Sequence, residues 1–403
     1  MSNSDVKELI VYGASWCPDC RRAKEFLGSN RVPYQWIDLE ANPERTAEVE
    51  DLNGGKRIIP TIIFPDGSFI AEPSNDELAE KLNISRAAKL REYDIVIIGG
   101  GPTGLTTAIY AARENAKVLV VEKSVPGGQA GITERLDNYP GFPDGVGGAE
   151  LADRITRQAK RYGVEILQAV SVTSISSVEN RVLVTTSIGA SVEAKAVLIA
   201  TGSTYRRTGA EGEEDLIGAG IHFCATCDGP FYNGAADLVV VGGGNSGLEE
   251  GLFLTQFADR VTIVQSGPTL SASRLLQDKV LAHPKMRVLT NTQLTKFNAD
   301  KVGKIESISV QDKATGVESD LSTSGAFIFV GLDPNTGFLA DQITTDNRGF
   351  IVTDQTFLTN IPGVFAAGDV RAGSTKQLAS AVGEGAAAAI QIRYYLDALS
   401  VHP

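Results

Sequence analysis

Residues 222–232 read His-Phe-Cys-Ala-Thr-Cys-Asp-Gly-Pro-Phe-Tyr, and residues 237–247 read Asp-Leu-Val-Val-Val-Gly-Gly-Gly-Asn-Ser-Gly. Cys224 and Cys227 have the C-x-x-C spacing that lets two thiols close a disulfide or bind a metal, and Asp228 beside them can exchange protons with a thiol. The second segment is an apolar strand followed by a G-x-G-x-x-G loop, the pattern of a dinucleotide-binding turn. Together they predict a redox dithiol directly ahead of a dinucleotide fold.

Length and charge limit the class of protein. The chain has 403 residues, 42% of them hydrophobic, which predicts two to four globular domains. A formal charge of −12 disfavours nucleic acid and anionic membranes as partners, because both attract basic patches. The first residues lack the apolar core of a signal peptide, and no apolar run approaches the roughly 18 residues of a membrane span. We therefore expect a cytoplasmic protein.

The four cysteines form two C-x-x-C pairs, Cys17 with Cys20 and Cys224 with Cys227. A shared zinc site is disfavoured, because 203 residues separate the pairs whereas zinc pairs are usually about 15–20 residues apart. A secreted disulfide framework is equally disfavoured in a long, cysteine-poor chain without an export signal. The cysteines therefore predict two redox centres and no metal.

The first pair lies where a strand predicted over residues 7–12 gives way to a helix over residues 21–27. Cys17 is therefore expected at a helix N-terminus, where free N–H groups and the helix dipole stabilise a thiolate. We assign Cys17 as the attacking thiol and Cys20 as the resolving thiol. Further elements follow at 34–39 (strand), from 42 (helix), at 57–64 (strand), at 66–67 (hairpin) and from the capping box 74–77 (helix).

Residues 1–84 resemble the glutaredoxin branch of the thioredoxin fold. The resemblance rests on Trp16-Cys-Pro-Asp-Cys20, on Ile-Pro-Thr at 59–61 and on Ser-Asn-Asp at 74–76. It implies that Pro60 is cis and faces the dithiol, whereas the strand pattern alone favours an edge-strand proline. The family's usual aromatic residue between the cysteines is Asp19 here, so glutathione remains an open question as a substrate.

A polar linker at 85–92 precedes another dinucleotide fingerprint, which is the first along the chain. A strand at 93–98, a glycine loop at 99–104, a helix at 105–113 and a strand at 117–121 end in an acid suited to a ribose hydroxyl. The predicted binding residues are Gly99, Gly101, Pro102, Thr103, Gly104 and Glu122. The later fingerprint repeats this spacing, with 18 residues from Gly247 to Gln265 as from Gly104 to Glu122. Its predicted residues are Gly242, Gly244, Asn245, Ser246 and Gly247.

With both fingerprints in view, residues 93–403 resemble low-molecular-weight thioredoxin reductases, whose redox motif is Cys-Ala-Thr-Cys-Asp. The resemblance implies that the first fingerprint binds FAD. Further FAD contacts are implied at Gly127, Gly128, Gln129, Asn138, Thr201, Gly202, Gly368, Asp369, Lys376 and Gln377. Lys376 stands where the family usually has arginine and keeps the charge.

The two resemblances imply an α/β fold class. A thioredoxin/glutaredoxin fold precedes two Rossmann-like domains of three ββα layers, the second inserted into the first. The expected divisions are 1–84 (glutaredoxin-like), 85–92 (linker), 93–205 with 334–403 (FAD-binding) and 206–333 (pyridine-nucleotide-type, with the dithiol). A homodimer is also implied.

The implied mechanism passes hydride from a nucleotide to the flavin, and electrons from the flavin to the Cys224–Cys227 disulfide. The dithiol then reduces a partner disulfide, with Asp228 as acid and base. The inserted domain is expected to rotate so that the dithiol meets flavin and partner in turn. The sequence does not indicate which of the two cysteines attacks the partner disulfide, although Cys227 is expected next to the flavin. His222 is expected to tune a thiol or to be an ordinary solvated or core histidine.

The donor is the main departure from the family pattern. Residues 264–268 read Val-Gln-Ser-Gly-Pro, where the family usually has His-Arg-Arg-Asp and a further arginine. The 2′-phosphate of NADPH prefers guanidinium groups and the ribose of NADH an acid, and Gln265 offers neither. The sequence therefore leaves three donors open: weakly bound NADPH, NADH or a non-nucleotide carrier.

The leading hypothesis is a thioredoxin reductase-like flavoenzyme, with NADPH as the donor by resemblance. Its partner is a thioredoxin- or glutaredoxin-type disulfide protein, including its own Cys17 and Cys20. One alternative is the flavoprotein reductase of a peroxidase system, although that group usually carries a doubled front module. Another, of a different class, is a non-catalytic FAD-binding redox sensor or electron carrier.

Overall fold

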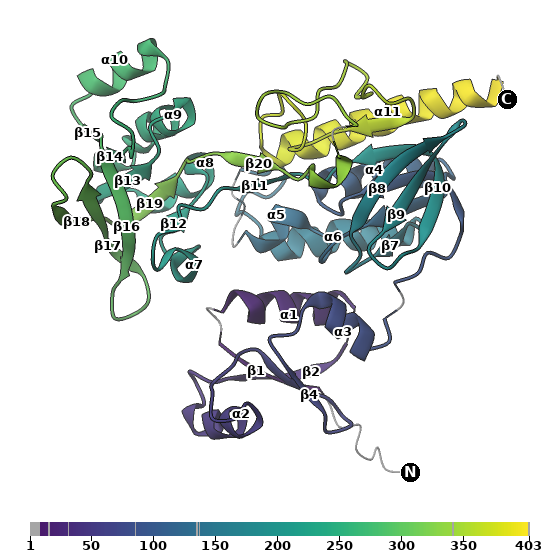
Figure 1. Ribbon diagram of the computed structural model, residues 1–403, viewed down its shortest axis with the longest axis horizontal. Helices are drawn as coiled ribbons and strands as arrows, with labels where there is room; N and C mark the ends of the chain where they lie inside the picture. The colour runs from purple at the N-terminus through teal and green to yellow at the C-terminus, as the bar shows by residue number, and fades with distance from the viewer. Residues whose placement is uncertain are drawn as a thin grey trace. The chain divides into compact units, whose positions relative to one another are not determined.

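The computed structural model describes residues 9–401 except 15, 16, 31, 85, 134, 135, 137 and 341 (Figure 1). Its contacts divide the chain into two compact units. Unit 1 comprises Met1–Thr133, Val146–Gly202 and Pro334–Pro403, and unit 2 comprises Glu134–Gly145 and Ser203–Asp333. Two short strands that pair with each other, β11 (Ser203–Tyr205) and β20 (Leu332–Pro334), mark where the chain enters and leaves unit 2.

The front of unit 1 is a four-stranded sheet with the order β2-β1-β3-β4. β1 pairs with β2 in parallel, and β3 is antiparallel to both of its neighbours. The elements in chain order are β1 (Leu9–Gly13), α1 (Pro18–Ser29), β2 (Tyr34–Asp38), η1 (Pro43–Arg45), α2 (Thr46–Leu52), β3 (Thr61–Ile63), β4 (Phe69–Ala71) and α3 (Asn75–Lys81). This order confirms the thioredoxin/glutaredoxin fold.

Local sequence explains where α1 and α3, two helices that cover this sheet, begin. Cys17 caps α1, and Ser74 with Glu77 forms the predicted capping box of α3. α1 and α3 lie on one side of the sheet and α2 on the other (Figure 1). Buried apolar side chains fill both interfaces, among them Phe26 under α1 and Val49 under α2. Each such side chain contributes about 1.5–3 kcal/mol by leaving water.

The strand predicted over 57–64 is shorter in the structure. Only Thr61–Ile63 is extended and paired, because Pro60 has no N–H for a sheet hydrogen bond and the chain turns there. The Ile59–Pro60 peptide is cis, as the resemblance implied. The predicted hairpin at Asp66–Gly67 is present and closes with a 2.8 Å bond from Phe64 N to Ser68 O. Trp16, part of the quoted motif, lies outside the described residues.

The rest of unit 1 is built on a seven-stranded sheet of order β7-β6-β5-β10-β9-β8, with β21 paired to β10. β5, β6, β7, β10 and β21 are parallel, and β8 and β9 are antiparallel. The strands are β5 (Glu92–Ile98), β6 (Val118–Val121), β7 (Glu165–Leu167), β8 (Val172–Val178), β9 (Arg181–Thr186), β10 (Ser191–Ile199) and β21 (Val364–Ala366). The helices are α4 (Pro102–Arg113), α5 (Gly128–Ile132), α6 (Gly148–Arg161), η3 (Gly337–Leu339) and α11 (Leu378–Val401).

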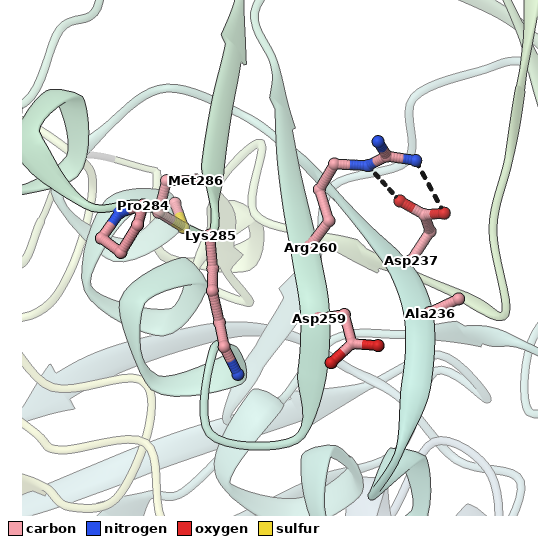
Figure 2. Close-up of a pocket in the computed structure, with 7 residues that line it drawn as sticks. All are labelled: Ala236, Asp237, Asp259, Arg260, Pro284, Lys285 and Met286. Carbon is pink, nitrogen blue, oxygen red and sulfur yellow. Dashed lines mark hydrogen bonds and ion pairs between the residues drawn. The ribbon is translucent and has the colours of Figure 1, made fainter.

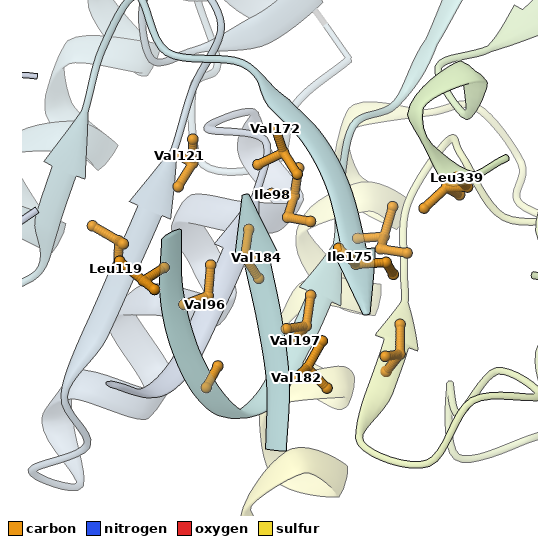
Figure 3. Close-up of a cluster of buried hydrophobic side chains, with 14 of the residues drawn as sticks. Val96, Ile98, Leu119, Val121, Val172, Ile175, Val182, Val184, Val197 and Leu339 are labelled. Atoms are coloured by element: carbon orange, nitrogen blue, oxygen red, sulfur yellow. The ribbon is translucent and has the colours of Figure 1, made fainter. Parts of the chain in front are cut away.

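Three layers enclose this core. On one face, α4 and α11 pack against the parallel strands with small and branched residues such as Ala108 and Ile392. On the other face, β8 and β9 bring Ile175 and Val184 against Val96 and Leu119 (Figure 3). The helix, parallel sheet and antiparallel ribbon give the predicted three-layer ββα arrangement. The glycine loop after β5 therefore opens at the carboxyl edge of the sheet, where such folds bind ligands.

Unit 2 repeats this plan. A parallel sheet of order β12-β19-β13-β14-β15 lies beside an antiparallel sheet β16-β17-β18. The strands are β12 (Ile221–His222), β13 (Ala235–Val241), β14 (Ala258–Val264), β15 (Met286–Leu289), β16 (Thr292–Ala299), β17 (Ile305–Asp312), β18 (Glu318–Ser322) and β19 (Gly325–Ile328). The helices are α7 (Glu213–Leu216), α8 (Ala225–Asp228), η2 (Gly229–Tyr232), α9 (Asn245–Leu254) and α10 (Arg274–Ala282).

The repeated plan confirms the α/β fold class with two Rossmann-like domains. The segment around Asn138, in Glu134–Gly145, groups with unit 2 although it interrupts the sequence of unit 1. Sequence periodicity did not indicate this, because the grouping depends on tertiary contacts. Among the helices that the structure describes, none is both long and apolar enough to cross a membrane.

Candidate active site

Cys224 and Cys227 form a disulfide at the start of α8, with Cα atoms 5.3 Å apart. Cys224 is the N-cap residue of this one-turn helix, and its sulfur accepts the N–H of Cys227 at 3.2 Å. A sulfur at an N-cap faces N–H groups that have no partner in the helix, which favours negative charge on it. The second half of the C-x-x-C motif therefore places hydrogen-bond donors where a thiolate would form.

Asp228 follows the disulfide, and the structure brings His222 to it. The distance from His222 Nδ1 to Asp228 Oδ2 is 3.5 Å, and the two side chains are 13% and 21% exposed. His222 ends β12, and Asp228 ends α8. His222 is therefore held partly buried against the predicted acid and base of the site, which sequence alone did not indicate.

Tyr232 completes this polar chain. Its hydroxyl lies 2.7 Å from His222 Nε2. Burial, followed by the charge of Asp228, raises the pKa of Tyr232 to about 12, so the phenol is neutral at physiological pH. Sequence analysis missed Tyr232 as a site residue, because a tyrosine at the end of a Gly-Pro-Phe-Tyr turn carries no signal beyond packing.

Glu250, on α9, lies at the start of α8 and was also missed. Its carboxylate accepts the backbone N–H groups of Ala225 and Thr226, and burial raises its pKa despite these bonds. Its Oε2 is buried and makes no hydrogen bond among the described residues. The dithiol turn therefore has two carboxyl groups beside it, one paired with histidine and one capping the helix.

Asn138 is the one predicted FAD contact that the structure places at the dithiol. Its Nδ2 lies 3.8 Å from Cys227 Sγ, and both residues belong to unit 2. The side chain is exposed. Its contact with FAD stays a prediction of the resemblance.

The first dithiol has the same local design as the second. Cys17 caps α1, and its sulfur accepts the N–H of Cys20 at 3.1 Å. Both thiols are free and buried, with Cys17 4% exposed and Cys20 fully covered. Burial, followed by the hydrogen bond to Cys17, raises the pKa of the Cys20 thiol, which keeps it protonated at neutral pH. The Cys17 thiol lies 3.8 Å from Ile59 O, beside the cis proline.

The first glycine loop has the shape that a dinucleotide requires. A methyl group at Gly104 would lie 2.0 Å from Gly99 O, so only glycine lets α4 pack this closely on β5. At Gly101, which caps α4, a methyl group would meet nothing within 4 Å. This side of the loop is open above the free N–H groups of the helix, where a pyrophosphate binds.

Glu122 ends β6, as predicted, and is 7% exposed. Its Oε2 accepts the N–H of Gly100 at 2.7 Å and its Oε1 that of Ser124 at 2.8 Å. Burial raises the pKa of Glu122, and the two N–H groups oppose this rise. Gly127 and Gly128 both have positive φ, and Gly127 donates to Gly100 O at 2.8 Å. The predicted flavin-contact loop therefore lies against the glycine loop.

A second predicted contact region, Gly368 to Gln377, also reaches the first fingerprint. Gly368 has φ 78°, and a methyl group there would lie 2.3 Å from Thr103 Oγ1. Its N–H donates to Glu384 at 2.7 Å. Burial raises the pKa of Asp369. Thr201 donates to Asn335 O at 2.8 Å, which joins the two segments of this domain.

Lys376 is partly buried in this region. Its Nζ donates to Asp369 O at 2.5 Å and to Arg371 O at 3.2 Å, and lies 4.1 Å from the centre of the Phe350 ring. Burial lowers the pKa of Lys376 to about 8, against the attraction of Asp369. The charge at this position is therefore sensitive to pH near neutrality, which an arginine's would not be.

The second glycine loop is also intact. A methyl group at Gly247 would lie 2.0 Å from Gly242 O, matching the Gly104–Gly99 approach. Gln265, at the end of β14, accepts the N–H of Gly243 with Oε1 at 2.9 Å and donates from Nε2 to Thr269 O at 3.3 Å. Asn245 accepts the N–H of Ser273 at 2.7 Å. Gln265 thus takes the structural role of Glu122 without its charge.

A pocket at the opposite edge of the parallel sheet of unit 2 is not the nucleotide site (Figure 2). It is lined from the amino ends of β13 and β14, whereas the glycine loop follows the carboxyl end of β13. Three of its four charged groups have partners: Arg260 is paired with Asp237, and Lys285 Nζ donates to two backbone carbonyls at 2.9 Å. We assign it no ligand.

Known proteins resemble the chain along both parts. Residues 93–385 match the family model "Pyridine nucleotide-disulphide oxidoreductase", and residues 9–70 match "Glutaredoxin". Thioredoxin reductase of Listeria innocua is 40% identical over 313 residues, which covers 78% of this chain and 97% of the relative. The Bacillus subtilis enzyme is 38% identical over 307 residues, covering 76% and 96%.

Solved structures agree. Thioredoxin reductase of Streptococcus pyogenes is 40% identical with a TM-score of 0.72, covering 76% of this chain and 99% of its own. That of Giardia duodenalis is 32% identical with the same TM-score, covering 76% and 100%. The matched region contains both glycine loops and the Cys224–Cys227 disulfide with Asp228. The chain therefore belongs to the pyridine nucleotide-disulphide oxidoreductase family, as an FAD-dependent disulfide reductase of the thioredoxin reductase type that carries a glutaredoxin domain in front.

Proposed function

We propose that this enzyme passes electrons from NADPH through FAD and Cys224–Cys227 to its own Cys17–Cys20 pair, which then reduces a thioredoxin- or glutaredoxin-type disulfide protein. The observation that carries the proposal is the shared design of the two dithiols. In each, the first cysteine caps a helix and its sulfur accepts the N–H of the second. Two helix-capped dithiols in one chain favour exchange between them.

FAD fits the first fingerprint. Gly101 opens toward the place of a pyrophosphate, Glu122 is positioned for the ribose, and the loops at Gly127 and Gly368 lie against the glycine turn. When bound, FAD supplies the two-electron transfer between a nucleotide and a disulfide. The protein's part is to orient it and to manage protons at the dithiol.

Proton handling at the second dithiol falls to Asp228. Reducing the Cys224–Cys227 disulfide breaks the S–S bond and consumes two electrons and two protons. We assign Asp228 to deliver a proton to a leaving thiolate and to accept one when the dithiol attacks its next disulfide. Its distance of 3.5 Å from His222 provides a second proton carrier beside it.

The relay to the front domain is a thiol–disulfide exchange that balances by itself. A thiolate of the second pair attacks one sulfur of an oxidised Cys17–Cys20 disulfide and forms a mixed disulfide. The remaining thiol of the second pair then displaces the front cysteine, which restores Cys224–Cys227 and leaves Cys17 and Cys20 reduced. The raised pKa of Cys20 supports Cys17 as the thiol that attacks the outside partner.

The identity of the electron donor is the most specific part of the proposal. Gly242, Gly244 and Gly247 support a pyrophosphate, with Asn245 and Ser246 opening the helix behind it. Gln265 is uncharged, and Ser266 next to it is exposed and polar. We therefore assign NADPH as the donor by family, with weak discrimination against NADH. The division into glutaredoxin-like, FAD-binding and inserted domains, the homodimer and the cytoplasmic location stay predictions.

Anaerobic titration tests this function. NADPH added to the FAD-loaded chain should bleach the flavin, and alkylation followed by peptide mass spectrometry should then find Cys224 and Cys227 reduced. Chemical reduction with dithionite is the control that shows the flavin and dithiol are competent. Bleaching by dithionite but by neither nucleotide would reject a nucleotide donor and support a different carrier.

A further inference from the structure

His222 lies between two polar groups, and the proposed function uses only its contact with Asp228. Its two ring nitrogens face two different polar groups, Tyr232 Oη at 2.7 Å and Asp228 Oδ2 at 3.5 Å. Only 13% of the side chain is exposed. Because each nitrogen has one partner, the ring has a fixed orientation between a phenol and a carboxylate.

The surroundings of His222 form a built site rather than a chance contact. The ring lies 5.3 Å from Phe327 and 5.4 Å from Tyr232, and these two rings are 5.7 Å apart. Gly325 makes room for the arrangement, because a methyl group there would lie 2.6 Å from Tyr232 Cζ. The packing of the aromatic rings and the space left by Gly325 together hold the Tyr232 hydroxyl against His222 Nε2.

The contacts of the two ring nitrogens favour one tautomer of neutral His222. The Tyr232 hydroxyl is neutral and has one hydrogen to donate, and Nε2 is its partner. If Tyr232 donates to Nε2, the ring hydrogen of a neutral His222 must be on Nδ1, which points at Asp228. The N–H on Nδ1 then faces the Asp228 carboxylate at ion-pair distance, with Nδ1 and Oδ2 3.5 Å apart.

We propose that His222 is a positioning residue that holds Asp228 and offsets its charge, and thereby changes the reactivity of the Cys224–Cys227 dithiol, as pH changes. The proposal deepens the proposed function, on which it rests for the role of Asp228. When His222 is protonated, its charge offsets that of Asp228, and the adjacent thiols ionise more easily. When His222 is neutral, the uncompensated carboxylate disfavours a second negative charge on the neighbouring sulfur.

Other groups near His222 must be separated from it. α8 contributes Asp228 and the two cysteines, and η2 contributes Tyr232. β19 contributes Phe327 and Gly325, which do not titrate. From α9, Glu250 bonds the N–H groups of Ala225 and Thr226 at the start of α8, with Glu249 next to it. Glu250 is the group that competes with His222 as the source of a pH effect.

Alkylation of the reduced dithiol tests the proposal without a donor or a protein partner. The FAD-loaded chain is reduced with dithiothreitol, desalted and treated with iodoacetamide between pH 5 and 9. Peptide mass spectrometry then measures the rate at Cys224 and at Cys227 separately from Cys17 and Cys20. The unmodified protein should show an inflection between pH 5 and 8, where histidine ordinarily changes charge, in addition to thiol ionisation.

His222→Gln should remove that inflection and lower the rate below it about threefold, equivalent to half a unit in thiol pKa. Tyr232→Phe keeps the histidine but removes its anchor, so the inflection should move by roughly half a pH unit and remain. Phe231→Leu, at the exposed neighbour of Tyr232, is the matched control and should leave the profile unchanged. Glu250→Gln should keep the inflection.

Either of two results overturns the proposal. One is that His222→Gln and Tyr232→Phe both keep the original inflection, with rates within twofold of the unmodified protein. The other is that Glu250→Gln alone removes it. Because the reductant is chemical, neither result bears on the nucleotide donor or on the relay to Cys17. Failure of this inference is therefore distinguishable from failure of the proposed function.

Discussion

Glu122 and Gln265 occupy the same position in the two fingerprints and make the same hydrogen bond. Glu122 accepts the N–H of Gly100 at 2.7 Å, and Gln265 accepts that of Gly243 at 2.9 Å. Each side chain holds the middle glycine of its loop from the end of the next strand. The amide therefore preserves the loop geometry of a dinucleotide site while removing the charge that selects a ribose.

The neutral site predicts weak preference between nucleotides. Two lost charge-assisted bonds to a 2′-phosphate, at about 1.5 kcal/mol each because the site is exposed, reduce NADPH affinity more than a hundredfold. Stopped-flow flavin reduction should therefore give similar saturation by NADPH and NADH. Micromolar saturation by NADPH with NADH ineffective would show that basic residues elsewhere, such as Arg274 or Lys279, bind the phosphate. Arg274 is 86% exposed and paired with Asp278.

Charge restored at this edge should restore selectivity. Ser266→Arg with Gly267→Arg should favour NADPH, because a side chain at 267 meets only the movable end of Gln265 at 2.9 Å. Gln265→Glu is the matched variant for the opposite direction, since an acid suits the unphosphorylated ribose. The ratio of kcat/KM for the two nucleotides is the readout, and equal ratios in all three proteins would place the selective contacts outside residues 265–267.

The first fingerprint should lose FAD when Gly101 gains a large side chain. Nothing lies within 4 Å of a methyl group at 101, so Gly101→Trp should fold and yet fill the space that the pyrophosphate needs. Gly28→Trp is the control, because an added methyl group at Gly28 also meets nothing within 4 Å and Gly28 is an exposed residue of α1, outside the glycine loop's sequence. Visible absorption after gel filtration should show colourless Gly101→Trp and yellow Gly28→Trp. Full flavin occupancy in Gly101→Trp would refute the assignment.

Lys376 should make the flavin potential depend on pH. Its pKa is lowered to about 8, so the positive charge is present below that pH and is lost above it. A positive charge near the flavin favours its reduced form, so the midpoint potential should fall more steeply above pH 8, by roughly an extra 15–30 mV. Lys376→Arg keeps its charge and should remove the extra fall. Potentiometric titration of both proteins is the measurement, and identical pH slopes would contradict the effect.

The features that could be predicted from the sequence are those that residues close together in the chain determine. Cys17 before Pro18 caps a helix, Ser74 pairs with Glu77, and close-packed glycines have no substitute at 104 or 247. These features depend on neighbours within a few residues. The redox and nucleotide motifs are local in the same way, and the fold class was implied by the resemblances that these motifs carry.

Contacts between elements far apart in the sequence could not be predicted from local sequence patterns. His222 reaches Asp228 only because β12 pairs with β19 and places its ring on Phe327. Glu250 reaches the N–H groups of α8 from α9, and Asn138 reaches Cys227 from another part of the chain. The strand predicted at 57–64 was too long because apolar composition outweighed the missing N–H of Pro60. In each case tertiary packing decided a position for which sequence offered alternatives.

In the proposed relay, Cys224–Cys227 reduces Cys17–Cys20 within one chain. A tethered pair has an effective concentration in the mM range, so the transfer should be first order and independent of protein concentration. Cys17→Ser should leave flavin reduction unchanged, because electrons reach the second dithiol first. Mixing Cys17→Ser chains with Cys227→Ser chains tests whether exchange also occurs between molecules, which should be slower and dependent on concentration.

The most direct measurement is the redox state of the front pair in Cys227→Ser after donor is supplied. The chain is oxidised and incubated anaerobically with NADPH. Free thiols are then alkylated, the chain is digested, and the mass of the Cys17–Cys20 peptide is measured by mass spectrometry. We expect an alkylated, reduced front pair in the unmodified protein and an intact Cys17–Cys20 disulfide in Cys227→Ser. A front pair reduced to the same extent and at the same rate in Cys227→Ser would contradict the relay.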